Sequence, residues 1–130
     1  MDRGIKIMDF TNPITNIIKE RTSVRTYTGQ PLESDVKEKL KHLLENNSFT
    51  SPFSKFASNV RFELISIPEF DPREKMRLGT YGVIEGTQDF IVGAVKKSKY
   101  DMEQYGYNLE TIILAATDLG LGTVWLGGTF

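Results

Sequence analysis

The chain has no cysteine, a single histidine and almost no net charge. The absence of cysteine excludes a disulfide framework, and His42 alone cannot build a metal cluster. The 16 basic residues are spread among 17 acidic ones, which gives a formal net charge of -1. Because no basic stripe forms, nucleic acid is not an expected partner.

Long apolar runs are missing as well. No stretch approaches the roughly 20 apolar residues that cross a membrane, and the start of the chain, MDRGIKIMDF, lacks the apolar run and cleavage site of a signal peptide. We therefore expect a cytoplasmic protein without a membrane partner. With 130 residues, 39% of them hydrophobic, the chain is long enough for one ordinary core, so residues 1–130 are expected to form one domain, or part of one.

A first helix is predicted from Asn12 to about Glu20, because Asn can cap free backbone amides and the following proline suits the first helical position. Its buried face would hold Ile14, Ile17 and Ile18. A second helix is predicted over 33–46. Its apolar stripe comprises Val36, Leu40, Leu43 and Leu44.

The rest of the chain alternates between strand and helix patterns. Strands are predicted over 60–67 and 89–95, and the polar, aromatic stretch 46–59 is predicted to be a loop. Residues 105–120 read as a largely apolar helix closed by a glycine, and the stretch 120–130, GLGTVWLGGTF, follows as a tight turn and a buried strand. Together these elements predict a mixed helix and strand fold.

Two segments could carry chemistry. In RTSVRTY, at 21–27, Arg21 and Arg25 with a hydroxyl between them could present two guanidinium groups to one phosphate. Alternatively, Arg21 interacts with the carbonyls at the helix end and Arg25 is a solvated surface residue. In GLGTVWLGGTF, the glycines would let the backbone approach a flat ligand, although glycines after a helix most often form a C-cap.

Taken together, RTSVRTYTGQPL, the helix VKEKLKHLLE and the later pattern E-x-x-x-L-A-A-x-x-L-G-L-G-x-x-W-L-G-G closely resemble the N-terminal half of the nitroreductase family of flavoproteins. The resemblance spans about positions 14–130. It implies an α+β fold, a three-layer α/β/α sandwich of which this chain holds the N-terminal part. It also implies FMN reduced by NAD(P)H, a small electron acceptor such as a nitroaromatic or quinone, and a homodimer with sites at the subunit interface.

The same resemblance assigns the cofactor contacts. The family's R-x-S-x-R segment holds the phosphate and ribityl chain of FMN, and it falls on Arg21, Thr22, Ser23 and Arg25. The family's strand beside the flavin ring falls on Leu126, Gly127 and Gly128. No side chain is assigned a catalytic role and no metal is implied, because in such enzymes the cofactor does the chemistry.

The chain also departs from the family. Where most members carry Gln-Pro-Trp after the second helix, it has SFTSPFSKFASN within the loop 48–59, so only weak candidates for flavin contact arise there. They are Ser51, Pro52, Ser54 and Lys55. The family runs to about twice this length, so we expect a product truncated at its C-terminus. A flavin-binding protein without turnover and a non-catalytic dimerisation module stay open as alternatives.

Two residues in the C-terminal third carry separate expectations. Glu110 lies within an apolar helix, where a carboxylate needs a partner. It is either paired structurally or placed near the flavin or the dimer interface. Trp125 is expected to anchor the core or an interface rather than to stack on the flavin.

Overall fold

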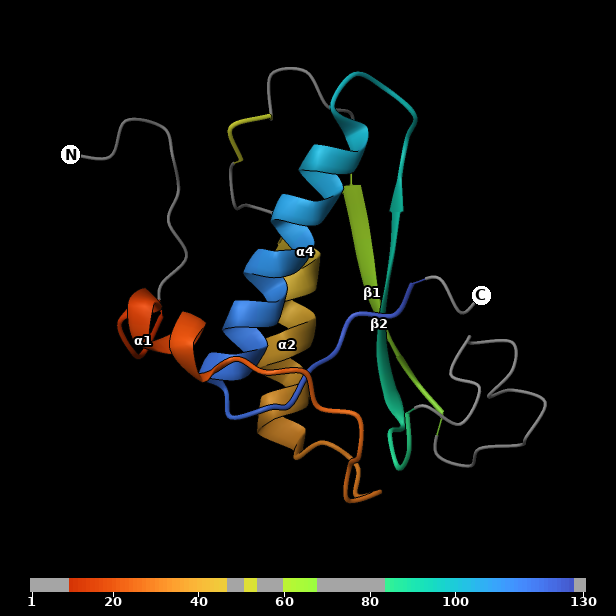
Figure 1. Ribbon diagram of the computed structural model, residues 1–130. Coiled ribbons are helices and arrows are strands. Elements are labelled where there is room, and N and C mark those ends of the chain that lie inside the picture. The colour runs from red at the N-terminus through yellow and green to blue at the C-terminus, as the bar shows by residue number, and fades with distance from the viewer. Residues whose placement is uncertain (1–9, 47–50, 54–59, 68–83, 128–130) are drawn as a thin grey trace.

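The computed structural model describes residues 10–46, 51–53, 60–67 and 84–127. Within these ranges three helices and two strands form, and Figure 1 shows their arrangement. They are α1 (Ile14–Glu20), α2 (Ser34–Asn46), β1 (Val60–Ser66), β2 (Asp89–Val95) and α4 (Asp101–Asp118). The three predicted helices and the strands predicted over 60–67 and 89–95 are therefore present, with boundaries shifted by a few residues.

The two strands pair antiparallel, and their register separates a covered face from an open one. Val60 pairs with Val95 and Phe62 with Gly93, so these positions share one face of the sheet. Helices α2 and α4 lie side by side against that face (Figure 1). The opposite face carries the exposed Arg61, Glu63 and Val92. The described residues thus supply one helical layer and the sheet of the predicted sandwich.

The core lies between the sheet and these two helices. Leu44 of α2, Phe62 of β1 and Ile112 of α4 form one buried cluster, and Ile112 is fully inaccessible to solvent. In α2, the predicted stripe is confirmed by the burial of Leu40 and Leu44. This burial follows from the helical spacing of four residues, which puts both side chains on one face.

Gly93 explains how α4 approaches the sheet closely. A Cβ at this position would lie 2.6 Å from the ring of Phe62 and 2.7 Å from the ring of Tyr105. Because glycine leaves that space free, the two rings pack with centroids 5.4 Å apart. A glycine inside a strand often marks such an approach.

Helix α1 begins differently from the prediction. Pro13 occupies the N-cap position and no side chain caps the helix. The side chain of Asn12 instead donates a 2.9 Å hydrogen bond to Asp118 at the end of α4. Of the predicted apolar face, Ile17 is buried, whereas Ile14 and Ile18 are 40% and 56% exposed. The helix is short and contacts α4, so only one of its isoleucines is covered within the described structure.

The end of α4 follows the glycine prediction. Gly120 has a φ of 84°. Its N–H donates a 2.9 Å hydrogen bond to the carbonyl of Thr117, and the N–H of Leu121 donates a 3.0 Å hydrogen bond to the carbonyl of Ala116. This is the Schellman arrangement, in which a left-handed residue satisfies the last helical carbonyls. The glycine thus terminates α4 and turns the chain back toward α1.

The predicted buried strand at 120–130 is not formed in the described part, 120–127. The segment makes one isolated parallel bridge, between Ser23 and Thr123. Trp125 is 45% exposed, so of the two roles expected for it, an anchor in the core is excluded and an anchor at an interface stays a prediction. The apolar composition predicted a strand, but a strand requires neighbours along its length, and the described residues pair with this segment only around Thr123. Among the helices of the described ranges, none is long and apolar enough to cross a membrane.

Candidate functional site

The structure brings the two predicted cofactor-binding segments together. Ser23 and Thr123 form a parallel bridge, and the N–H of Val24 donates a 2.9 Å hydrogen bond to the carbonyl of Thr123. Figure 1 shows the corresponding stretches, which follow α1 and α4, running beside each other. The segment around the paired arginines therefore lies next to the glycine-containing segment, as a single binding site for phosphate and ring would require.

Gly122 permits this contact. A Cβ on Gly122 would lie 3.0 Å from the Cβ of Val24, which is tighter than most side-chain contacts. The glycine thus lets the chain after α4 lie directly against Val24. Thr123 and Val24 were not singled out from the sequence. A glycine preceding a β-branched residue is too common a signal to predict their contact.

The other side of the 21–27 segment is held by residues 84–86. Thr26 and Glu85 form a second parallel bridge. The backbone N–H of Tyr27 donates to the carbonyl of Glu85 at 2.8 Å, and the backbone N–H of Glu85 donates to the carbonyl of Arg25 at 2.8 Å. Gly86 has a φ of 77°, and a side chain there would overlap the carbonyl of Tyr27. Burial raises the pKa of the Tyr27 hydroxyl. The segment from Ser23 to Tyr27 is therefore fixed between two parts of the chain that are distant in sequence.

Two buried polar atoms in this region have no hydrogen-bond partner. They are Nη1 of Arg21 and Oγ1 of Thr123. Arg21 is the C-cap residue of α1, but it is its backbone N–H that bonds to Ile17, at 3.0 Å. A buried guanidinium nitrogen without an acceptor is costly. An anion such as a phosphate would satisfy it.

The remaining residues predicted to hold FMN differ in their exposure. Thr22, Ser23 and Arg25 are exposed, so their polar groups are available to solvent or a ligand. Leu126 is half-buried, and a Cβ on Gly127 would meet no atom within 4 Å. Gly128 lies outside the described residues. The backbone at Gly127 is therefore open to a neighbouring group.

Glu110 and Trp125 are partners. The indole Nε1–H of Trp125 donates a 3.1 Å hydrogen bond to Oε2 of Glu110 on α4. The structural pairing expected for Glu110 is confirmed by this contact. The contact also ties the segment after α4 to the helix itself. The partner could not be identified from the sequence, because the spacing between the two residues is set by the turn at Gly120.

The loop candidates are only partly described. The Ser51 hydroxyl is buried and donates a hydrogen bond to the side-chain oxygen of Gln104 on α4. Phe53 packs on Tyr100 with ring centroids 5.8 Å apart. Pro52 is exposed. Ser54 and Lys55 lie outside the described residues, as do the other loop positions over 47–50 and 56–59. Ser51 thus serves to attach the loop to α4.

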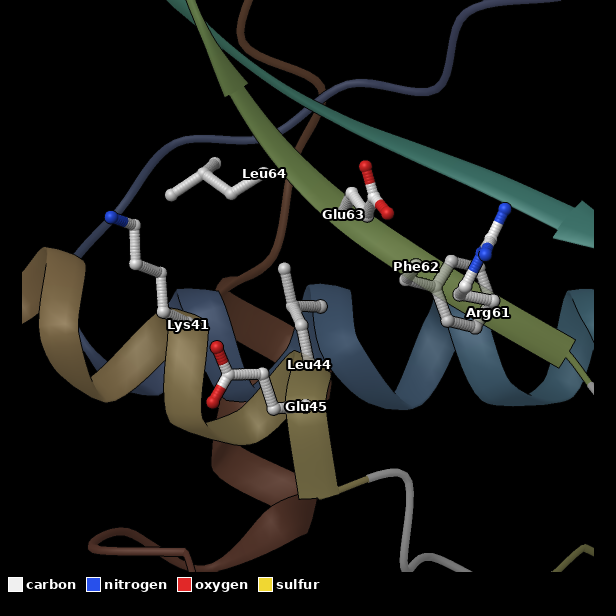
Figure 2. Close-up of a pocket in the computed structure, with 7 residues that line it drawn as sticks. All are labelled: Lys41, Leu44, Glu45, Arg61, Phe62, Glu63 and Leu64. Atoms are coloured by element: carbon white, nitrogen blue, oxygen red, sulfur yellow. The ribbon is translucent and has the colours of Figure 1, made fainter.

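A separate groove of about 490 Å³ lies between α2 and β1. Figure 2 shows that Leu44 and Phe62 lie between the helix and the strand, while the Arg61 and Glu63 side chains point away from α2. None of the lining residues is one of the predicted FMN contacts. They are Lys41, Leu44, Glu45, Arg61, Phe62, Glu63 and Leu64. Opposite charges alternate along its rim, which favours neither an anion nor a cation.

The part of the chain that the structure describes contains no set of metal-binding side chains. There, no group of three His, Cys, Asp or Glu side chains could hold a metal ion. His42 is exposed on α2 and has an interaction partner.

Comparison with known proteins places the chain. A family model described as "Putative TM nitroreductase" matches residues 13–130. The chain belongs to this nitroreductase family. Among curated proteins none matches it. The nitroreductase assignment was expected from the two sequence motifs, and the match over nearly the whole chain confirms it.

A solved structure supports the nitroreductase fold. It is described as a putative nitroreductase in complex with FMN from Desulfovibrio desulfuricans, and it aligns with a TM-score of 0.66 at 24% sequence identity. The alignment covers 89% of this chain and 69% of that chain. At this identity the likeness shows the fold. The predicted α+β nitroreductase fold is therefore confirmed.

Proposed function

We propose that this nitroreductase-family chain binds FMN and acts as an oxidoreductase. It would pass electrons from NAD(P)H to a small acceptor such as a nitroaromatic or quinone. The observation that carries the proposal is the contact between the Ser23 and Thr123 segments. It joins the segment of the phosphate-binding candidates to the stretch that leads into the ring-binding candidates. The neighbouring fold described with FMN and the family membership support the same cofactor.

The residues present fit the charge of FMN. Arg21 offers a buried Nη1 that has no acceptor, and Thr123 offers a buried hydroxyl that also has none. Arg25 and Ser23 lie exposed on the same segment. Arginines form paired, charge-assisted hydrogen bonds with phosphate oxygens. We therefore propose that Arg21, Thr22, Ser23 and Arg25 hold the phosphate and ribityl chain.

The ring would lie along Leu126, Gly127 and Gly128. Gly127 has open space around its Cβ position, so its main-chain amide is accessible to a flat group. When bound, FMN would supply the electron-transfer chemistry. The chain binds and orients the cofactor, and the apolar Leu126 keeps water from one side of it. No side-chain nucleophile, general acid or metal ion is assigned a role.

We also propose a homodimer with a cytoplasmic location. Several large apolar side chains are exposed on α1 and α4, among them Ile18 at 56%, Met102 at 64% and Tyr107 at 45%. Association with a second copy would remove such apolar side chains from water. Analytical ultracentrifugation over a range of concentrations would measure the association.

The test is a titration of FMN with this chain, followed by the quenching of flavin fluorescence. Saturable quenching at micromolar protein is the expected result. Absence of quenching would contradict the proposed cofactor and favour the non-catalytic dimerisation module. The acceptor is tested next, by following NADH and NADPH oxidation with a nitroaromatic and with a quinone. Binding of FMN without any turnover would favour the alternative of a flavin protein that has lost activity.

A further inference from the structure

The Trp125–Glu110 contact is the last attachment of the C-terminal segment before the proposed ring-binding residues. Trp125 is the only tryptophan of the chain. Its indole is 45% exposed, yet its Nε1–H is fixed by the Glu110 carboxylate at 3.1 Å. Leu126 and Gly127 follow immediately. Whatever fixes the indole therefore also constrains the backbone beside it.

Little else holds this part of the segment. Before it, the carbonyl of Thr123 accepts a hydrogen bond from Val24. Over positions 124–127, as the structure describes them, the indole contact is the one hydrogen bond formed. At Gly127, a Cβ would have no neighbour within 4 Å. The course of the backbone from Thr123 to Gly127 thus depends on the pairing at one end and on Glu110 at the other.

Glu110 is suited to this task because it sits on a rigid element. It lies in the middle of α4, whose end is closed at Gly120 and whose buried side contacts the sheet. An indole N–H bonded to a carboxylate forms a charge-assisted hydrogen bond, which is stronger than a neutral one. A loop attached in this way loses part of its conformational freedom before a ligand arrives, which lowers the entropic cost of binding.

We infer that Glu110 is a positioning residue of the flavin site: it holds the Trp125 indole and thereby sets the backbone of Leu126 and Gly127 for the cofactor ring. The inference rests on the proposed function, because it assigns Glu110 a role in FMN binding. If the pairing were merely structural, loss of the carboxylate would lower stability but leave the FMN affinity of the folded protein unchanged. A positioning role predicts that the FMN affinity falls.

The experiment compares the FMN affinity of four variants with that of the wild type by flavin fluorescence. Glu110→Ala should weaken FMN binding about tenfold, the effect of one lost charge-assisted hydrogen bond. Glu110→Gln keeps an acceptor oxygen for the indole and should restore most of the affinity. Trp125→Phe removes the donor while keeping an aromatic ring, and should resemble Glu110→Ala. The matched control is Glu38→Ala, which removes an exposed carboxylate from α2 and should bind FMN like the wild type.

A double-mutant cycle tests whether the two residues act together. If Glu110 acts through Trp125, combining Glu110→Ala with Trp125→Phe should weaken FMN binding no more than either change alone. Additive losses would overturn the inference. A Glu110→Ala variant that is folded by circular dichroism and binds FMN as tightly as the wild type would also overturn it.

The emission of Trp125 provides a readout that does not depend on FMN. Since the chain has one tryptophan, its fluorescence anisotropy reports the indole alone, and Glu110→Ala should lower that anisotropy in FMN-free protein. If wild-type protein shows no FMN binding, the proposed function fails and the cofactor role of Glu110 fails with it. If wild-type protein binds FMN but Glu110→Ala leaves both anisotropy and affinity unchanged, only the positioning role is overturned.

Discussion

Ser23 and Thr123 lie opposite each other in a parallel bridge that joins the segment after α1 to the segment after α4. The helices themselves explain why these segments meet. Helix α1 packs on α4, and the Asp118 carboxylate accepts hydrogen bonds from the backbone of Thr11 at 2.7 Å and of Asn12 at 3.2 Å. The start of α1 is therefore fixed at the end of α4, and the packing of the two helices keeps the chain after α1 close to the chain after α4.

The contact between Gly122 and Val24 predicts a specific steric effect. In Gly122→Ala, the new Cβ would lie 3.0 Å from Val24, so the two segments must move apart by a few tenths of an ångström. We expect a loss of about 1 kcal/mol in the free energy of unfolding, as for mild overpacking, together with weaker FMN binding. Chemical denaturation and FMN titration measure the two effects.

The control for this prediction is the second change Val24→Ala in the same protein. Removing the methyl groups of Val24 takes away two of the three close contacts and should partly restore FMN binding in Gly122→Ala, while the 3.0 Å contact with the Cβ of residue 24 stays. If Gly122→Ala behaves like the wild type in both assays, the close approach of the two segments is not required for the site.

Arg21 and Arg25 should contribute unequally to FMN binding. Arg21 presents a buried Nη1 without a partner, whereas Arg25 is exposed to water. We expect Arg21→Ala to weaken FMN binding by about 3 kcal/mol and Arg25→Ala by about 1.5 kcal/mol, the upper and lower ends of the range for hydrogen bonds to charged groups. Isothermal titration calorimetry with FMN gives both values. Riboflavin, which lacks the phosphate, is the control ligand. It should bind the wild type, Arg21→Ala and Arg25→Ala with similar affinity.

Two glycines provide opposite predictions for stability. A Cβ at Gly93 would collide with the rings of Phe62 and Tyr105, whereas one at Gly106 in α4 would meet nothing within 4 Å. Gly93→Ala should therefore cost about 1 to 3 kcal/mol through overpacking. Gly106→Ala should add about 0.5 to 1 kcal/mol, because alanine favours the helix interior. Urea unfolding measures both. Equal effects of the two changes would contradict the packing of α4 on the sheet.

Periodicity predicted those elements whose cause is local. The stripe through Leu40 and Leu44 and the alternation in β1 give helix and strand directly, because each pattern reflects one buried face. The glycine after α4 also acts locally, through its φ of 84° at Gly120. The family resemblance added the expectation that residues 21–25 and 126–128 share a site, which stays a prediction; the structure pairs Ser23 with Thr123, three residues before Leu126.

Contacts between distant segments could not be predicted. Asn12 was expected to cap α1, but its side chain reaches Asp118 instead, and nothing near Asn12 in the sequence signals that partner. The pairing of Thr26 with Glu85 and the hydrogen bond from Trp125 to Glu110 also join residues that are distant in sequence, and they could not be predicted for the same reason. The predicted strand at 120–130 is wrong in its described part for a related reason, since an apolar composition indicates burial but does not supply the neighbouring strands.

Asp118 predicts a pH-dependent attachment of the N-terminal segment. Burial acts to raise the pKa of its carboxyl group, but the hydrogen bonds donated by Thr11 and Asn12 outweigh that effect, so the pKa is lowered overall. A lowered pKa in the folded state means that the charged form stabilises the fold. This stabilisation is complete above the unfolded-state pKa of about 3.9 and is lost as the pH falls through the lower, folded-state pKa.

We therefore expect Asp118→Ala to cost about 1 kcal/mol of unfolding free energy at neutral pH, since the hydrogen bonds lie at the surface where water competes for them. As the pH is lowered below about 4, the difference in melting temperature between this variant and the wild type should shrink, because protonation removes the same contacts. The control variant Glu38→Ala, at an exposed position on α2, should follow the wild type throughout. Thermal unfolding at a series of pH values provides the measurement, and a constant difference between wild type and Asp118→Ala down to about pH 2 would show that the carboxylate charge does not hold the segment.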